Sequence, residues 1–234
     1  MEDIYRTFEE KFHINFKDKN LLRQAFIHRS YINENKDTGL DHNERLEFLG
    51  DAVLELIVTK YLFDRFPDTK EGVLTAYRSA LVRTESISAA ARKMGMNDLL
   101  KLSKGEAKDE GRARDYILAN TFEAFIGAVY LDQGYAKAKE IVEQVLLGDI
   151  DTIIATGSWK DAKSRVQEYA QEQYGKTPRY EVVSATGPDH DKHFVVAIYF
   201  GDKKVAEGEG RSKQHAQQDA AKKAIEKEGW SHNA

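Results

Sequence analysis

The chain has 234 residues, of which 41% are hydrophobic and 32% charged, and its formal net charge is −4. These values are ordinary for a globular protein of one large or two modest domains. Because cysteine is absent, disulfides and thiolate metal sites are excluded, so any metal ion would need oxygen or imidazole ligands. No apolar run approaches the roughly 18 residues of a membrane span, and the N-terminus lacks the apolar core of a signal peptide. We therefore expect a cytoplasmic protein that does not enter membranes.

Helical periodicity, with apolar residues at i, i+3 and i+4, dominates the first part of the chain. Pro67 and Gly95 are typical of the ends of such segments. The pattern predicts an all-α domain over residues 1–148. Its expected helices are Met1–Lys11, Lys19–His28, Asn43–Phe66, Glu71–Met94, Asp115–Leu131 and Tyr135–Leu147.

The pattern changes after a connector at residues 149–159. A helix is expected over Asp161–Tyr174, followed by short β-rich runs at residues 178–185, 192–200 and 203–210 that turn sequences separate. Ser212 is a typical N-cap for a final helix that ends near Glu228. Residues 160–230 therefore predict a small α+β domain with the order α-β-β-β-α.

Acidic side chains gather on one predicted helix, in "NERLEFLGDAV". At about 100° per residue, Glu44, Glu47 and Asp51 fall within an arc of about 60°. A solvated face is the ordinary explanation of such an arc, and the helix dipole favours an acid such as Glu44 in the first turn. The dipole does not explain Asp51, which lies two turns further along. A bound cation would explain it.

A second predicted helix, "ILANTFEAFIGAVYLD", places Asn120 and Glu123 on one edge. Packed beside the first helix, it could direct Glu47, Asp51, Asn120 and Glu123 at one Mg²⁺, which prefers oxygen ligands. The charge distribution agrees, because residues 160–230 carry 13 Lys/Arg against 12 Asp/Glu, whereas the remainder carries 22 against 27. The acidic helical part is therefore where a divalent cation is expected.

The motifs "HNERLEFLGDAVLEL" and "ILANTFEAFIGAVYLD", with "FIHRSY" and "GRARDYILA", resemble the ribonuclease III family almost continuously over residues 1–148. Residues 160–230, with "KSRVQEYAQ" and "GEGRSKQHAQQDAAKKA", resemble the double-stranded RNA-binding domain that follows in bacterial members. The resemblance implies an RNA-processing endonuclease that hydrolyses double-stranded RNA with Mg²⁺, or with Mn²⁺ in its place. Its products would carry 5′-phosphate and 3′-hydroxyl ends with short 3′ overhangs.

Carried over position by position, the resemblance makes Asp51 and Glu123 the catalytic pair of metal ligands and Glu47 a further ligand. Glu44 corresponds to a catalytic acid just outside direct coordination. Asn120 stands where most bacterial relatives carry a ligating aspartate. An amide oxygen can ligate a cation or orient a water, but it contributes no charge. The alternative to an active nuclease is therefore a double-stranded RNA-binding protein with weakened or absent cleavage.

Phe48 lies on the acidic side of its helix, about 40° from Glu44 and away from the apolar stripe of Leu46, Leu49 and Val53. Such a ring is buried either in its own chain or by another chain. The resemblance implies the second arrangement, because the corresponding aromatic of the family inserts into a socket on a partner. We therefore expect a homodimer.

In the second domain, the resemblance assigns RNA contacts to residues on two helices and a loop. Gln167 and Glu168 match the minor-groove surface of the first helix, and His190 matches the contact to the neighbouring minor groove. Lys213, at the start of the last helix, matches the phosphate clamp, and a helix N-terminus favours such an anion. Gln214 stands where the family usually has a second lysine. Lys222 and Lys223 are either RNA contacts or solvated surface.

Overall fold

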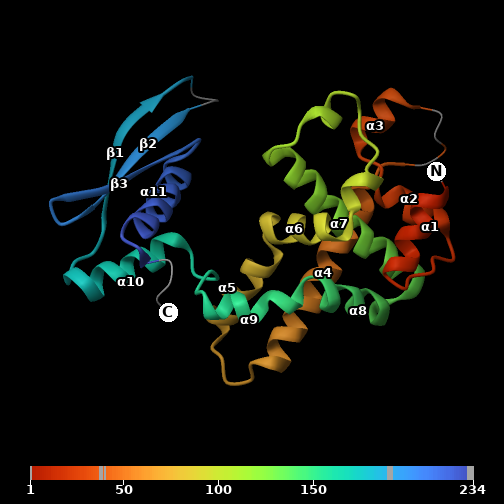
Figure 1. Cartoon of the computed structure of the whole chain (residues 1–234), viewed down its shortest axis with the longest axis horizontal. Helices are drawn as coiled ribbons and strands as arrows, with labels where there is room; N and C mark the ends of the chain where they lie inside the picture. The colour runs from red at the N-terminus through yellow and green to blue at the C-terminus, as the bar shows by residue number, and fades with distance from the viewer. Residues whose placement is uncertain (1, 37–38, 40, 189–191, 231–234) are drawn as a thin grey trace. The chain divides into compact units, whose positions relative to one another are not determined.

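The computed structural model describes residues 2–36, 39, 41–188 and 192–230 (Figure 1). The chain divides into two compact units, Met1–Asp151 and Thr152–Ala234. The first unit is helical, and the second contains a β-sheet with helices. The predicted fold class, an all-α domain followed by a small α+β domain, is confirmed. The domain limits 1–148 and 160–230 stay predictions, and the expected connector contains a short helix, α9 (Ile150–Ala155).

The first unit is built from eight α-helices in its described part, and three 3₁₀ helices lie in the segments that follow α6 and α8. Among the described residues, no helix is long and apolar enough to cross a membrane. The helices are α1 (Glu2–Lys11), α2 (Lys19–Ala25), α3 (Arg29–Glu34), α4 (Glu44–Arg65), α5 (Glu71–Val82), α6 (Thr84–Met94), α7 (Arg112–Gln133) and α8 (Tyr135–Val145).

The prediction of one helix over Glu71–Met94 is wrong, because Arg83 interrupts it with an extended backbone, φ −67° and ψ 152°. The Arg83 carbonyl accepts hydrogen bonds from the amides of Ser86 (2.9 Å) and Ile87 (3.1 Å), which starts α6. The Ser86 hydroxyl donates to the Ala80 carbonyl at 2.7 Å, which closes the end of α5. Local hydrogen bonds thus support a break within a continuous apolar pattern.

The helix predicted over Lys19–His28 ends at Ala25, and α3, which was not predicted, follows it. His28 caps α3, because its Nδ1 accepts a hydrogen bond from the Ser30 amide at 3.3 Å. Asn43 then fixes the start of α4: its buried side chain donates to the Ala25 carbonyl at 3.0 Å. The hydrogen bond from Asn43 to Ala25 therefore anchors the start of α4, the helix that carries Glu44, Glu47 and Asp51.

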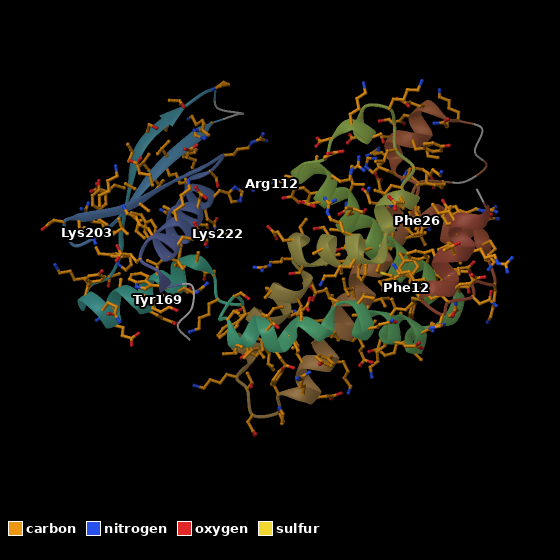
Figure 2. All side chains as sticks on the ribbon, viewed as in Figure 1. Phe12, Phe26, Arg112, Tyr169, Lys203 and Lys222 are labelled. Carbon is orange, nitrogen blue, oxygen red and sulfur yellow. The ribbon has the colours of Figure 1, made fainter. Side chains whose placement is uncertain are left out.

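The centre of the first unit is the crossing of α4 and α7, at which the two backbones touch. A Cβ atom on Gly50 would lie 1.7 Å from the backbone oxygen of Glu123, and one on Gly127 would lie 2.3 Å from that of Leu46. Only glycine fits at either position. Aromatic rings such as Phe12 and Phe26 complete the core of this unit (Figure 2).

The second unit consists of α10 (Ala162–Tyr174), β1 (Arg179–Thr186), β2 (His193–Phe200), β3 (Lys203–Gly210) and α11 (Lys213–Lys227). The strands form one antiparallel sheet in the order β1-β2-β3. Both helices contribute to a single core, in which Val166, Ile198 and Ala220 are fully buried. A Cβ atom on Gly208 would lie 2.0 Å from the amide nitrogen of Ala220, so this glycine lets α11 pack directly against β3.

Because the α4–α7 crossing has no room for a Cβ atom at Gly50, a small substitution there should reduce stability by an unusually large amount. Gly50→Ala should lower the free energy of unfolding by about 3 kcal/mol, the upper end of the range for overpacking, because rigid backbone must move. Alanine favours a helix over glycine by about 1 kcal/mol, so the clash outweighs propensity. Gly72→Ala is the matched control, since Gly72 is helical and has open space around its Cβ position. Urea unfolding followed by circular dichroism measures both, and equal stabilities would contradict the close crossing.

Candidate active site and RNA-binding surface

The α4–α7 crossing brings together Glu47, Asp51, Asn120 and Glu123, which we call the carboxylate site. The side chain of Asn120 forms a hydrogen bond with the Glu47 carboxylate. Glu123 interacts electrostatically with Asp51 and with Glu47. The four residues that sequence analysis grouped from two distant segments therefore share one neighbourhood.

The carboxylate site concentrates negative charge in a partly buried place. Burial, with smaller contributions from the nearby charges of Asp51 and Glu47, raises the pKa of Glu123 to about 7. Burial and the charge of Glu44 also raise the pKa of Glu47, whereas the hydrogen bond from Asn120 lowers it. Carboxylates in such surroundings favour a proton or a cation.

The donor atoms of the carboxylate site fit a hard divalent cation. All four side chains offer oxygen, which Mg²⁺ and Mn²⁺ prefer, and a cation would offset the burial and neighbouring charges that raise the pKa values of Glu47 and Glu123. Among the described residues, no group of three His, Cys, Asp or Glu side chains is arranged to hold a metal ion. Repulsion between carboxylates favours their separation when no cation lies between them.

Glu44 lies at the outer end of the acidic edge of α4. Its carboxylate is exposed and lies 3.3 Å from Arg29 Nη1 and 3.7 Å from His42 Nδ1. Its charge still raises the pKa of Glu47. Glu44 therefore adds to the potential of the carboxylate site while it contacts basic side chains outside it.

Sequence analysis missed Glu55, which lies one turn beyond Asp51 on α4. Its charge is among those that raise the pKa of Glu123. Its carboxylate is half-buried and pairs with Arg78 Nε of α5 at 3.1 Å. The i+4 spacing of Glu47, Asp51 and Glu55 was the available signal.

Phe48 is not part of the core of its own chain. It is 83% exposed, and Leu56 and Phe63 on the same helix are 58% and 68% exposed. These three side chains fall within an arc of about 80° on α4. We call them the apolar face of α4. The alternative that Phe48 packs inside its own chain is therefore excluded.

The predicted RNA contacts of the second unit lie on its two helices. Gln167 and Glu168 are exposed on α10, and Glu168 forms a salt bridge with Lys160. Lys213 is the exposed first residue of α11, and Ser212 caps this helix by accepting a hydrogen bond from the His215 amide at 3.2 Å. His190 lies outside the described residues.

The two later lysines of α11 differ in their surroundings. Lys223 pairs with Asp219 at 2.8 Å, which ties it to its own helix. Lys222 is exposed (Figure 2) and forms no salt bridge with any residue in the described part of the chain. Of these two, Lys222 is better placed for a phosphate.

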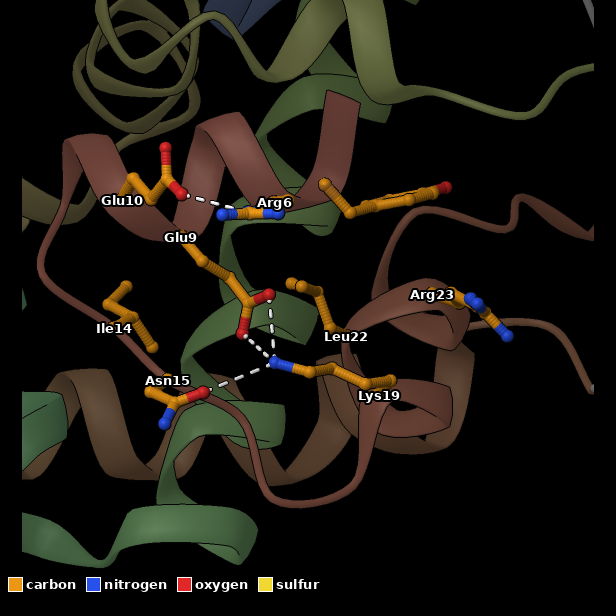
Figure 3. A pocket seen from close by; sticks show the side chains of 9 residues that line it. Arg6, Glu9, Glu10, Ile14, Asn15, Lys19, Leu22 and Arg23 are labelled. Carbon is orange, nitrogen blue, oxygen red and sulfur yellow. Dashed lines mark hydrogen bonds and ion pairs between the residues drawn. The ribbon is translucent and has the colours of Figure 1, made fainter. Parts of the chain in front are cut away.

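A pocket of about 440 Å³ lies between α1 and α2, and none of the predicted site residues lines it. Its buried acid, Glu9, accepts hydrogen bonds from Lys19 Nζ (2.7 Å) and from the Phe16 amide (2.8 Å) (Figure 3). Arg6 and Glu10 pair with each other on the rim at 2.9 Å. These acids are paired within the chain, so we assign them a role in local structure and no catalytic role.

Comparison with known proteins identifies the family of the chain. A family model described as Ribonuclease-III-like matches residues 18–150, and one described as Double-stranded RNA binding motif matches residues 162–228. Ribonuclease 3 of Streptococcus pneumoniae strain P1031 is 44% identical over 230 residues, which are 97% of each chain. The chain belongs to the ribonuclease III family. The resemblance drawn from the motifs is confirmed, and this ribonuclease III family member is an endoribonuclease with a double-stranded RNA-binding domain.

Solved structures of ribonuclease III nuclease domains resemble the first unit. One from Campylobacter jejuni is 37% identical with a TM-score of 0.54, and it covers 63% of this chain and 93% of its own. A second from the same organism is 39% identical with a TM-score of 0.53, covering 59% of this chain and 92% of its own. Its description refers to a region involved in dimer formation.

The raised pKa of Glu123 predicts how stability depends on pH without a cation. Because burial and the neighbouring carboxylates raise it from 4.5 to about 7, the stabilising proton is fully bound below about pH 4.5 and lost as the pH rises through about 7. In EDTA, the free energy of unfolding should therefore fall over this window, and Glu123→Gln should reduce the fall. Asn120→Asp, which adds a neighbouring carboxylate, should steepen it. Urea unfolding at about pH 5 and about pH 7.5 measures the three proteins. Identical slopes would contradict the assigned surroundings of Glu123.

Proposed function

We propose that Glu47, Asp51, Asn120 and Glu123 hold Mg²⁺, or Mn²⁺ in its place, for hydrolysis of double-stranded RNA. The products would have 5′-phosphate and 3′-hydroxyl ends with short 3′ overhangs. The proximity of the exposed Asp51 to the half-buried Glu47 and Glu123 where α4 crosses α7 carries this proposal, because a divalent cation neutralises that charge. The cytoplasmic location expected from the sequence belongs to the same proposal.

Each residue contributes differently to the reaction. When bound, the metal lowers the pKa of a coordinated water and neutralises charge on the phosphoryl oxygens. Asp51 and Glu123 would hold it from opposite helices, and Glu123 would exchange its proton for the cation near neutral pH. The hydrogen bond of Asn120 would favour the ionised form of Glu47, against burial and the charge of Glu44, which raise the pKa of that carboxyl. Glu44 would act from outside direct coordination, beside Arg29.

A second candidate function follows from Asn120. With an amide in place of a carboxylate, the site has one charge fewer, which weakens attraction for a divalent cation. The chain would then bind double-stranded RNA and cleave it slowly or not at all. The two candidates differ in one readily measured result, the Mg²⁺-dependent shortening of a long RNA duplex.

A Mg²⁺ titration of cleavage on one duplex separates these candidates. The parent chain should shorten the duplex with Mg²⁺ and not with EDTA. Asn120→Asp should lower the Mg²⁺ concentration for half-maximal cleavage and raise the rate, because changes near a metal commonly alter affinity or activity roughly 10- to 100-fold. Glu123→Gln should abolish cleavage and leave duplex binding nearly intact. Parent and Asn120→Asp curves that coincide would mean that Asn120 does not face the cation.

We also propose that the chain works as a homodimer through the apolar face of α4. Large exposed apolar side chains in a contiguous row typically mark an interface. The described region of dimer formation in the Campylobacter jejuni nuclease domain supports this assembly. Self-association would remove Phe48, Leu56 and Phe63 from water.

Phe48→Glu should convert the dimer to monomer and strongly reduce cleavage, because a charge in an apolar interface is costly unless paired. Ile4→Glu is the control, since Ile4 is an exposed apolar residue on α1, outside the apolar face of α4. Sedimentation velocity gives the assembly state of each variant. A Phe48→Glu variant that sediments as the parent does would refute this interface.

Lys213→Ala should weaken duplex binding about equally for unrelated sequences, because it removes a phosphate contact. The dependence of affinity on salt should also become shallower, since fewer counterions are released on binding. Lys203→Ala is the control, because Lys203 is exposed on β3 and pairs with Glu228. Filter binding over a salt series measures both variants. A changed sequence preference with an unchanged salt slope would argue against the phosphate role.

A further inference from the structure

The first half of α7 reaches solvent along one narrow strip. All but four of residues 114–124 are buried, and these four are Asp115, Tyr116, Asn120 and Glu123. At about 100° per residue, the last three fall within an arc of about 60°, whereas Asp115 lies outside it. The side of α7 that carries two members of the carboxylate site therefore continues, one turn earlier, to Tyr116.

Tyr116 is the most accessible residue of this strip. It is 54% exposed, whereas Asn120 and Glu123 are half-buried. Its hydroxyl has no hydrogen-bond partner among the residues that the structure describes. It lies about 6 Å from Asn120 along the helix axis. A nucleic-acid strand with one phosphate at the carboxylate site would therefore pass Tyr116 with a neighbouring nucleotide.

Three charged residues lie in the first turn of α7, and they differ in their surroundings. Arg114 is buried and donates to the Glu106 carbonyl at 2.9 Å. Asp115 pairs with Arg92 Nη2 at 2.6 Å. Arg112, labelled in Figure 2, is exposed and forms no salt bridge with any described residue. Of the three, Arg112 is therefore the one placed to pair with an external anion.

Arg112 also lies on the side of α7 that faces solvent at Tyr116. It precedes Tyr116 by four residues, so the two side chains are neighbours on the helix surface. Side chains on a helix lean toward its N-terminus, which directs the Tyr116 ring over the turn of Arg112. A hydroxyl donor and an unpaired guanidinium thus extend the strip away from the carboxylates.

We propose that Tyr116 binds the sugar–phosphate backbone of the RNA strand beside the nucleotide held at the carboxylate site, and that Arg112 pairs with a phosphate further along this strand. The inference rests on the proposed cleavage function, because a strand held at that site lies over the accessible strip of α7. Tyrosine hydroxyls are common donors to nucleic-acid backbones. The bases of a duplex stay stacked, so the contact uses the hydroxyl and not the ring face.

Other roles of Tyr116 would give different results. A tyrosine that is only solvated surface could be replaced without effect. One that packs against a second copy of the chain would change the assembly state when it is removed, and one that orients Asn120 would change the Mg²⁺ requirement. A contact made equally in the bound substrate and in the transition state changes KM and leaves kcat unaltered.

The first test measures KM and kcat of the full chain on a long RNA duplex in Mg²⁺. Tyr116→Phe removes only the hydroxyl and should raise KM about 2- to 10-fold, the range for one lost hydrogen bond, with kcat and the Mg²⁺ requirement unchanged. Tyr116→Ala should have a similar effect. Tyr130→Phe is the matched control, because Tyr130 is an exposed tyrosine of the same helix that lies beyond the crossing with α4.

The second test measures duplex affinity over a salt series, in Mg²⁺ and in a Glu123→Gln background that prevents cleavage. Arg112→Gln should weaken binding about equally for unrelated sequences and reduce the salt slope by about one. Arg112→Lys keeps the charge and should keep the slope. Lys139→Gln is the control, because Lys139 lies on α8 and pairs with Glu143 at 3.6 Å.

The inference alone would be overturned if the parent cleaved the duplex in Mg²⁺ while Tyr116→Phe kept the parental KM. A Tyr116→Ala variant that sediments as a smaller species than the parent would also overturn it, since the side chain would then belong to an interface between copies. A parent that shortens no duplex in Mg²⁺ would contradict the proposed cleavage function instead. The duplex affinities of Tyr116→Phe and Arg112→Gln would then decide whether the backbone contact exists.

Discussion

Direct backbone contact between α4 and α7 is the constraint on which the first unit depends. Gly50 and Gly127 allow the helices to meet without intervening side chains. Residues that flank the crossing are then brought close together, although about seventy positions separate them in the sequence. Glu47 reaches Asn120, and Asp51 affects Glu123. With a larger residue at the crossing, the helices would separate and the acids would no longer share one electrostatic environment.

That environment is unfavourable for the chain alone. Burial and neighbouring acids raise the pKa values of Glu123 and Glu47, so the ionised forms of these two side chains are disfavoured until positive charge arrives. Asn120 moderates the conflict, because its amide stabilises the ionised form of Glu47 without adding charge. Under the proposed function, this amide would lower the electrostatic cost of folding and also weaken the attraction for the cation.

The long helices and their acidic residues could be predicted because periodicity and charge are local properties of the sequence. The break at Arg83 could not, because both α5 and α6 continue the apolar pattern and only backbone hydrogen bonds distinguish them. The glycine contact also escaped, since Gly50 and Gly127 are ordinary helix residues until the partner helix is present. Glu55 was missed for a similar reason: its significance comes from Glu123 and Arg78, which lie on other helices. His190 lies outside the described residues, so its assignment rests on the family resemblance.

α4 contributes to three different surfaces of the first unit. For this reason its sequence does not divide simply into an apolar half and a polar half. Leu46, Val53 and Ile57 face the core. Another side carries the acids, and the exposed apolar face lies directly beside it, with Phe48 next to Glu47 and Leu56 next to Glu55 in the sequence. Burial of that face by a second chain would reduce solvent access to the neighbouring acids and strengthen their interaction with a cation, because screening falls as water is removed. Assembly and cation affinity are therefore expected to be coupled through this one helix. The loss of activity in a monomeric variant would then include weaker cation binding.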